Sequence, residues 1–166
     1  MSSLFNHVFI PLVILLLFSE KFKIHPKNIF ILAIFGIIPD IDMFFYHRAS
    51  FHNIFLVLIP FIFLILRDNK EIPGIICFYL TSHLLLDIFN GGVYILYPFN
   101  ELAFYVKAEL AFRNDIFLPV LNFGFRSSIF YTGAGEPAVS SENIGVVLIL
   151  LLISGVSILK KRINSF

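Results

Sequence analysis

The stretch Pro73–Asn90, which reads PGIICFYLTSHLLLDIFN, has the composition of a helix in lipid and still carries two ionisable side chains. It contains no lysine or arginine, and its length approaches the roughly 20 residues that a membrane-crossing helix needs. His83 and Asp87 are four residues apart, so a helix places them on one face. Ionisable groups within a membrane are costly and usually mark a working site. The stretch therefore predicts a membrane protein with a functional site in its apolar part.

The rest of the chain has the same apolar character. Its 166 residues are 58% hydrophobic, with 22 phenylalanines and no tryptophan, and the mean hydropathy is +0.91. This length suits one domain. A net charge of +1 gives no basic footprint for nucleic acid, and the single cysteine, Cys77, excludes an internal disulfide.

Apolar segments recur along the chain, and basic residues separate them. The candidate spans are Leu4–Phe18, Asn28–Tyr46, Phe51–Leu66, Pro73–Asn90 and Asn143–Leu159. The loops after the first and third spans, and the C-terminal tail, hold the basic residues Lys21, Lys23, Lys27, Arg67, Lys70, Lys160, Lys161 and Arg162. The positive-inside rule makes these three regions cytoplasmic. We therefore expect an all-α integral membrane protein, a helical bundle of about five transmembrane helices with its N-terminus outside and its C-terminus inside.

Three parts follow from this topology. Residues 1–100 form a membrane-embedded core with the metal site, residues 101–142 an outer interfacial segment, and residues 143–166 the final transmembrane helix and basic tail. Glu109 and Arg113 are spaced as an i,i+4 pair on an interfacial helix. This outer segment either covers the site and helps to admit a lipid head group, or is a surface segment without a catalytic part.

The predicted orientation brings the unusual residues to one rim, at the outer ends of the spans. They are carboxylates and imidazoles, which are ligands for divalent metals. The expected metal ligands are His7, Asp40, Asp42, His47, His52, His83 and Asp87. Four of them are also the expected catalytic residues, namely Asp40, Asp42, His83 and Asp87.

Each element also has a plainer interpretation. Pro39 breaks the helix, so Asp40 and Asp42 both reach one cation on an unwound turn, or they form a polar helix end in water. Asp87 binds the metal, orients His83, or joins it in a structural hydrogen-bonded pair. Arg48 binds the substrate phosphate bidentately or extends to lipid head groups.

Mixed nitrogen and oxygen ligation favours Zn²⁺, with Mn²⁺ or Fe as alternatives, and the ligand set suffices for two or more ions. Such clusters activate water and stabilise in-line displacement at phosphorus. We therefore expect a membrane-bound metal-dependent hydrolase acting on a membrane lipid or lipid-linked phosphate near the outer leaflet of the cell membrane. A metal or proton transporter and a non-catalytic membrane scaffold are the alternatives.

The order of the elements resembles the YdjM-like family of membrane-bound, metal-dependent hydrolases, also called the LexA-binding, inner-membrane-associated hydrolases. The resemblance covers about residues 1–100 and rests on His7, Pro39–Asp42, His47–Asn53, Ser82–Asp87 and Gly91–Phe99. It implies metal binding, and a more distant similarity to zinc-dependent phospholipases C implies hydrolysis of a phosphodiester or phosphomonoester.

The chain departs from the family pattern beside the ligands. Asn6 stands where the family has Thr, and Ala49, Phe51 and Asn53 stand where it often has Gly, Thr and Ser. The expected ligands are all kept. The departures affect the hydrogen bonds that Thr or Ser would supply around them.

Overall fold

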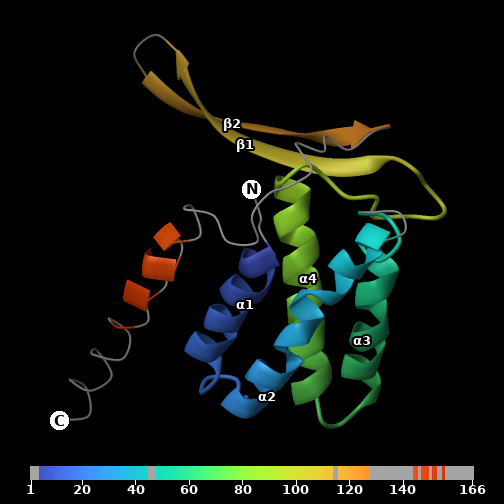
Figure 1. The fold of residues 1–166 in the computed structure, drawn as a ribbon, viewed down its shortest axis with the longest axis vertical. Helices are drawn as coiled ribbons and strands as arrows, with labels where there is room; N and C mark the ends of the chain where they lie inside the picture. Colours follow the sequence, from blue (N-terminus) through green and yellow to red (C-terminus); the bar gives the residue numbers. More distant parts are fainter. Residues whose placement is uncertain are drawn as a thin grey trace.

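The computed structural model describes residues 4–44, 48–113, 116–127, 144–145, 147–149, 151–152 and 155. In chain order the helical elements are α1 (Leu4–Phe18), α2 (Pro26–Ile31), the 3₁₀ helices η1 (Leu32–Gly36) and η2 (Ile38–Phe44), α3 (Ile54–Leu66) and α4 (Glu71–Phe89). Two strands follow, β1 (Ala103–Arg113) and β2 (Ile116–Arg126). Figure 1 shows the strands as a long hairpin that lies across one end of the helices.

The helix α4 is the centre of the helical part. It contacts α1, α2, η1 and α3, and its C-terminal end contacts β1. One core cluster joins Leu15 of α1, Ile29 of α2, and Ile75 and Tyr79 of α4. The hydroxyl of Tyr79 donates a buried hydrogen bond of 3.1 Å to the carbonyl oxygen of Ile29. Packing around α4 thus positions the short helices against the longest one.

The expected bundle of about five transmembrane helices is wrong. Among the described residues, α4 is the helix that is long and apolar enough to cross a membrane. Its 19 residues extend about 28 Å, close to the roughly 30 Å of a hydrocarbon core. The helices α1 and α3 have 15 and 13 residues and fall short of that length. An apolar run does not by itself distinguish a full span from a shorter packed helix.

The second expected span is divided into three short pieces. The six-residue α2 is followed by η1, which ends at Gly36, and then by η2, which begins at Ile38, directly before Pro39. Pro39 has no N–H to donate, and short i→i−3 turns such as Asp40 N–H to Ile37 C=O replace regular α-helix there. The last expected span, Asn143–Leu159, and the basic tail lie mostly outside the described residues.

The interfacial helix expected within residues 101–142 is also wrong, because this segment contains the hairpin. The strands pair antiparallel from Ala103 opposite Arg126 to Arg113 opposite Ile116. Along β1, Lys107 and Glu109 alternate with apolar residues at the period of two that a strand requires. The i,i+4 charge pair that suggested a helix is a single pair and carries little information. Phe117, Leu121, Phe123 and Phe125 share one face and are each 60–67% exposed.

The segment between α4 and β1 ties the hairpin to the helices. The N–H of Gly92 donates to the carbonyl oxygen of Asp87 at 2.9 Å, and Val93 and Phe104 exchange two backbone hydrogen bonds. Gly92 has φ +93°, and a Cβ there would lie 2.8 Å from the Phe104 carbonyl oxygen. A glycine is needed at this close approach.

Candidate metal centre

Four ligand atoms from three parts of the chain converge beneath the hairpin. Asp40 comes from η2, His52 from the turn before α3, and His83 and Asp87 from α4. All four ligand atoms lie within 4.8 Å of one another. His52 Nε2 is 3.5 Å from Asp40 Oδ1 and 3.0 Å from Asp87 Oδ2. His83 Nε2 is 3.6 Å from Asp40 Oδ1 and 3.4 Å from Asp87 Oδ2.

These separations fit a tetrahedral ion. Zn²⁺ bonds to nitrogen and oxygen of about 2.0–2.2 Å give tetrahedron edges of about 3.3–3.6 Å. The four nitrogen–oxygen edges just given and the 3.0 Å edge between the two Nε2 atoms lie close to that range. The residues therefore fit a divalent ion without a change of fold.

The outer nitrogens of the two imidazoles set their tautomers. His83 Nδ1 lies 2.8 Å from the Gly36 carbonyl oxygen, which can only accept, so Nδ1 carries the proton. His52 Nδ1 lies 2.8 Å from Asp42 Oδ2, which also accepts when ionised. The two Nε2 atoms consequently face each other across 3.0 Å. Two neutral imidazoles would oppose lone pairs there, so the pair needs a cation, either a proton or a metal.

Asp42 lies behind His52 and not with the four ligands. In a 3₁₀ helix of three residues per turn, residues two apart point in different directions, which separates Asp42 from Asp40. Besides His52, Asp42 accepts hydrogen bonds from the backbone N–H groups of Arg48 at 3.3 Å and Phe51 at 3.1 Å. The fully buried Asp42 carboxylate thus shapes the turn that presents His52.

Arg48 and His7 contact the second oxygen of Asp87. Arg48 Nη2 and His7 Nε2 lie 3.3 Å and 3.4 Å from Asp87 Oδ1. The His7 ring stacks on His83, with centroids 3.8 Å apart. Arg48 Nη1 also donates to the Asn90 carbonyl oxygen at 2.9 Å. The two oxygens of Asp87 therefore contact different partners. Oδ2 faces the imidazoles of His52 and His83, and Oδ1 faces Arg48 and His7.

Burial and charge distinguish the four ligands. The His52 and His83 side chains are fully buried and Asp87 is 2% exposed, while Asp40 is 17% exposed. The centre therefore opens at Asp40. Burial by itself would lower the pKa of His52. Hydrogen bonds with the carboxylates of Asp40, Asp42 and Asp87 outweigh the effect of burial and raise the pKa of His52 to about 10.

The sequence-predicted residues thus divide into groups. Asp40, His52, His83 and Asp87 form the four-ligand group, and Asp42, His7 and Arg48 surround it. His47 lies outside the described residues. Whether each acts as a ligand or in catalysis stays a prediction.

Sequence reasoning missed Gly36, and it named Asn53 without predicting its role as a helix cap. Gly36 supplies the carbonyl that orients His83. Asn53 begins α3, accepting from Leu56 N–H at 3.2 Å and donating to the Ser50 carbonyl oxygen at 2.8 Å. A helix-capping signal, an Asn directly before an apolar run, could have identified Asn53. Gly36 had no such signal, because its role depends on a residue 47 positions away.

Comparison with known proteins identifies the family of the chain. The chain matches no curated protein and no solved structure. It matches the family described as YdjM inner membrane protein over residues 1–163, which extends through the hairpin and beyond the 100 residues that carry the motifs. The chain therefore belongs to the YdjM inner membrane protein family.

Proposed function

We propose that the protein is a membrane-bound, metal-dependent hydrolase that cleaves a phosphoester of a lipid or lipid-linked substrate. The observation that carries this proposal is the pair of Nε2 atoms of His52 and His83, which face each other across 3.0 Å beside two carboxylates. Such a group is costly to bury unless a cation occupies it. Nitrogen and oxygen ligands at these separations suit Zn²⁺, with Mn²⁺ or Fe as alternatives.

The proposed reaction assigns separate tasks to the residues. A divalent ion, when bound, supplies Lewis acidity and makes water a nucleophile at neutral pH. The buried side chains of His52, His83 and Asp87 exclude bulk water from three sides of the centre. Asp40 is the most exposed of the four residues and lies where substrate and water arrive. In the reaction its carboxylate would act as general base in place of a ligand, which leaves an open position for the attacking water whose proton it accepts.

A second ion would bind on the other side of Asp87. His7 Nε2 and Asp87 Oδ1, which lie 3.4 Å apart, would supply two ligand atoms there. Arg48 already brings positive charge to the same oxygen, so a second ion would have to displace its guanidinium from Asp87 Oδ1. In the proposed reaction its guanidinium, which is 11% exposed, faces the substrate phosphate from this side.

The proposed site faces the outer side of the membrane. Support comes from the basic loops, which lie at the opposite end of α4. The N–H of His25, in the loop with Lys23 and Lys27, donates to Glu71 Oε1 at 2.6 Å. Glu71 begins α4, and Asp87 lies about 24 Å farther along that helix. The positive-inside rule then assigns the metal end to the outside.

The proposed interfacial segment is the hairpin. Its apolar face, which includes Phe104 and Val106 of β1 opposite Phe125 and Phe123 of β2, has the character of a surface that contacts lipid. Lys107 is exposed and alternates with these residues on β1, so the other face is polar. A two-stranded ribbon has unpaired edges and does not cross a bilayer, so it would lie in the interface beside the centre.

The test is metal content together with hydrolysis. Purified wild type should contain at least one transition-metal ion per chain by plasma mass spectrometry, and His52→Ala and His83→Ala should lose it. His25→Ala is the matched control, because His25 caps α2 far from the centre. Wild type should also release phosphate or phosphorylated head group from phospholipid vesicles, and the two metal-site variants should not.

Two results would contradict the proposal. A wild type that binds neither Zn²⁺ nor Mn²⁺ after loading would leave the His/Asp group with a structural or proton-carrying role. A metal-loaded wild type that hydrolyses no phosphoester, while moving the ion across a vesicle membrane, would identify a transporter.

A further inference from the structure

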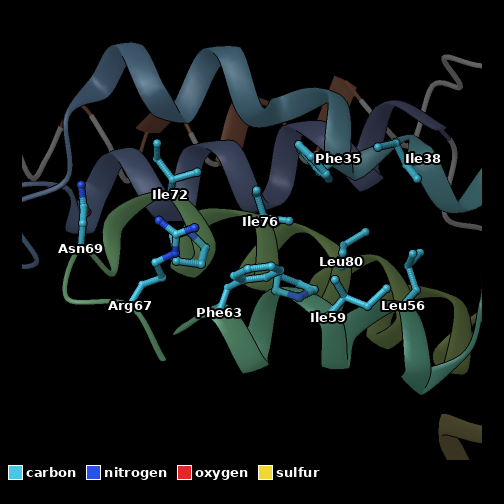
Figure 2. A pocket seen from close by; sticks show the side chains of 12 residues that line it. Phe35, Ile38, Leu56, Ile59, Phe63, Arg67, Asn69, Ile72, Ile76 and Leu80 are labelled. Carbon is cyan, nitrogen blue, oxygen red and sulfur yellow. The ribbon is translucent and has the colours of Figure 1, made fainter. Parts of the chain in front are cut away.

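An apolar groove runs along the helices, and the residues at one of its ends are close in sequence to the metal ligands. It encloses about 540 Å³ between α3, α4 and the two 3₁₀ helices, a volume within the range of small-molecule sites. Ten of its twelve lining residues are apolar, and the two polar ones are Arg67 and Asn69. Figure 2 shows these two at one end and Ile38, Leu56 and Leu80 toward the other.

The residues at the end of the groove away from Arg67 are close in sequence to the metal ligands. Ile38 precedes Asp40 by two residues, and Leu80 lies about one helical turn before His83. Leu56 lies in the first turn of α3, four residues after His52. From Leu56 to Arg67 the groove follows α3 for about 16 Å.

We propose that this groove holds a hydrocarbon chain of the substrate, with the phosphoester at the metal centre and the chain running toward Arg67. This inference rests on the proposed function and adds to it the class of substrate, a phospholipid or lipid-linked phosphate recognised by its chain. It also assigns the lining residues of the groove as the determinants of chain length.

The chemistry of the lining selects this occupant. A peptide in the groove would bring backbone N–H and C=O groups that need hydrogen-bond partners. Apart from Arg67 and Asn69 at one end, the side chains that line the groove are apolar and supply no such partners. A hydrocarbon chain has no such groups. Ile59 and Phe63 are 57% and 48% exposed, so the groove is open along α3. In an inner membrane protein this open side lets a lipid chain enter laterally from the bilayer.

The direction of the chain follows from the two ends. The phosphate belongs at the end with the metal ligands, because the divalent ion that the proposed function places there would attract it. The Arg67 guanidinium lies 5.9 Å from the centroid of the Phe63 ring, at the far end of the groove. A longer chain would pass Arg67 only by leaving the groove, so its lining limits the chain length that binds well.

The experiment uses a phospholipid with a photoreactive diazirine on its acyl chain, in vesicles containing the full-length protein. We expect saturable labelling in which a diazirine near the glycerol marks Leu56 or Leu80 and one near the chain end marks Phe63 or Ile72. Unlabelled phospholipid should compete. Ile59→Trp and Ile76→Trp, which narrow the groove from opposite walls, should reduce labelling roughly tenfold.

Ile62→Trp is the matched control. Ile62 lies on the same helix and is 50% exposed, but it does not line the groove. Labelling that does not saturate, or that falls equally in Ile62→Trp and Ile59→Trp, would show bulk lipid contact and overturn the inference. Labelling in the reverse order along the groove would also overturn it.

Hydrolysis separates this inference from the proposed function. Ile59→Trp should raise KM for a long-chain phosphoester and leave hydrolysis of a short, water-soluble phosphoester and the metal content unchanged. If the soluble ester is hydrolysed but Ile59→Trp affects both esters alike, the groove assignment fails and the hydrolase stands. If neither ester is hydrolysed while labelling remains saturable and selective, the chain-binding groove stands and the hydrolase fails.

Discussion

Gly36 and His83 are joined by a hydrogen bond of 2.8 Å from His83 Nδ1 to the Gly36 carbonyl oxygen, across 47 residues of sequence. The same glycine lies against α1: a Cβ on Gly36 would be 2.7 Å from the His7 carbonyl oxygen and 3.3 Å from Val8 Cα. Gly36 therefore brings η1 close enough to α1 and α4 for its carbonyl to orient a metal-facing imidazole. The absence of a side chain is what allows this approach.

Gly36→Ala should weaken metal binding and destabilise the fold. The new methyl group meets backbone and not the end of a flexible side chain, so η1 must move away from α1 and take the Gly36 carbonyl with it. We expect a loss of metal affinity of about 10- to 100-fold, measured by titration with a competing chelator. Gly74→Ala is the control, because its Cβ would meet only Leu64 Cδ1 at 3.6 Å. Equal metal affinities in the two variants would contradict the role given to Gly36.

Asp42→Asn should lower metal affinity without removing a ligand. The amide can no longer accept all the hydrogen bonds that the carboxylate takes from His52 Nδ1 and two backbone N–H groups. We expect about a 10- to 100-fold weaker site with unchanged metal stoichiometry at saturation. Asp40→Asn replaces a charged carboxylate oxygen of the four-ligand group by a neutral amide oxygen and should lower affinity further. If Asp42→Asn also abolished binding at saturating metal, Asp42 would itself be a ligand.

Metal binding should depend on pH through His52. Its pKa of about 10 in the folded, metal-free protein lies above the ordinary histidine pKa of 6.5, so the bound proton stabilises that fold. That stability is fully present below pH 6.5 and is lost as pH rises toward 10. A metal ion must displace this proton, so apparent affinity should rise by about tenfold per pH unit across this window.

Thermal unfolding at several pH values checks this prediction. The chelator-treated protein should unfold at a lower temperature as pH rises from 6.5 to 10, and the metal-loaded protein should not follow this decline. A chelator-treated protein whose unfolding temperature stays constant over the window would contradict the coupling.

Asn53→Ala should destabilise the start of α3. The substitution removes the cap on Leu56 N–H and the bonds from Asn53 Nδ2 to the Ala49 and Ser50 carbonyl oxygens. Loss of an N-cap costs about 1 kcal/mol. Asn53→Ser, which restores the residue frequent in the family, should keep the cap and recover most of that free energy of unfolding. Denaturant titration in detergent measures both; equal stability of the two variants would refute the capping role.

Leu121→Asp should impair action on lipid in vesicles. Leu121 is 60% exposed on the apolar face of β2, where a charge opposes contact with the bilayer. The adjacent Asn122 lies on the other face, opposite Lys107, so Asn122→Asp is the control. We expect a severalfold loss of lipid hydrolysis for Leu121→Asp alone, with a soluble phosphoester unaffected in both. The same loss in Asn122→Asp would indicate a general effect of charge.

The sequence predicted which side chains gather in one group better than it predicted the architecture around them. His83 and Asp87 are four residues apart on a helix, so their shared face follows from local geometry. Buried carboxylates and imidazoles are few in so apolar a chain, so their types alone indicated a metal. The family resemblance over the first 100 residues is confirmed and extended to residues 1–163.

Helix length and hairpin formation were beyond the sequence pattern. The run Asn28–Tyr46 is apolar enough for one span, but its division into α2, η1 and η2 depends on packing against α1 and α4. Hydropathy averages over such a run and does not detect the close approach at Gly36. The hairpin was missed because alternating apolar residues in residues 101–142 were interpreted through one helical charge pair.

Three properties follow from local sequence: the chain is apolar, α4 is helical, and the apolar segments of the chain carry carboxylates and imidazoles. Which of these carboxylates and imidazoles come together depends on the tertiary fold. Asp40 and Asp42 differ by two positions, yet the 3₁₀ turn sends one to the four-ligand group and the other behind His52. The different positions of Asp40 and Asp42 depend on how each side chain is directed relative to distant elements, which their spacing in the sequence does not specify.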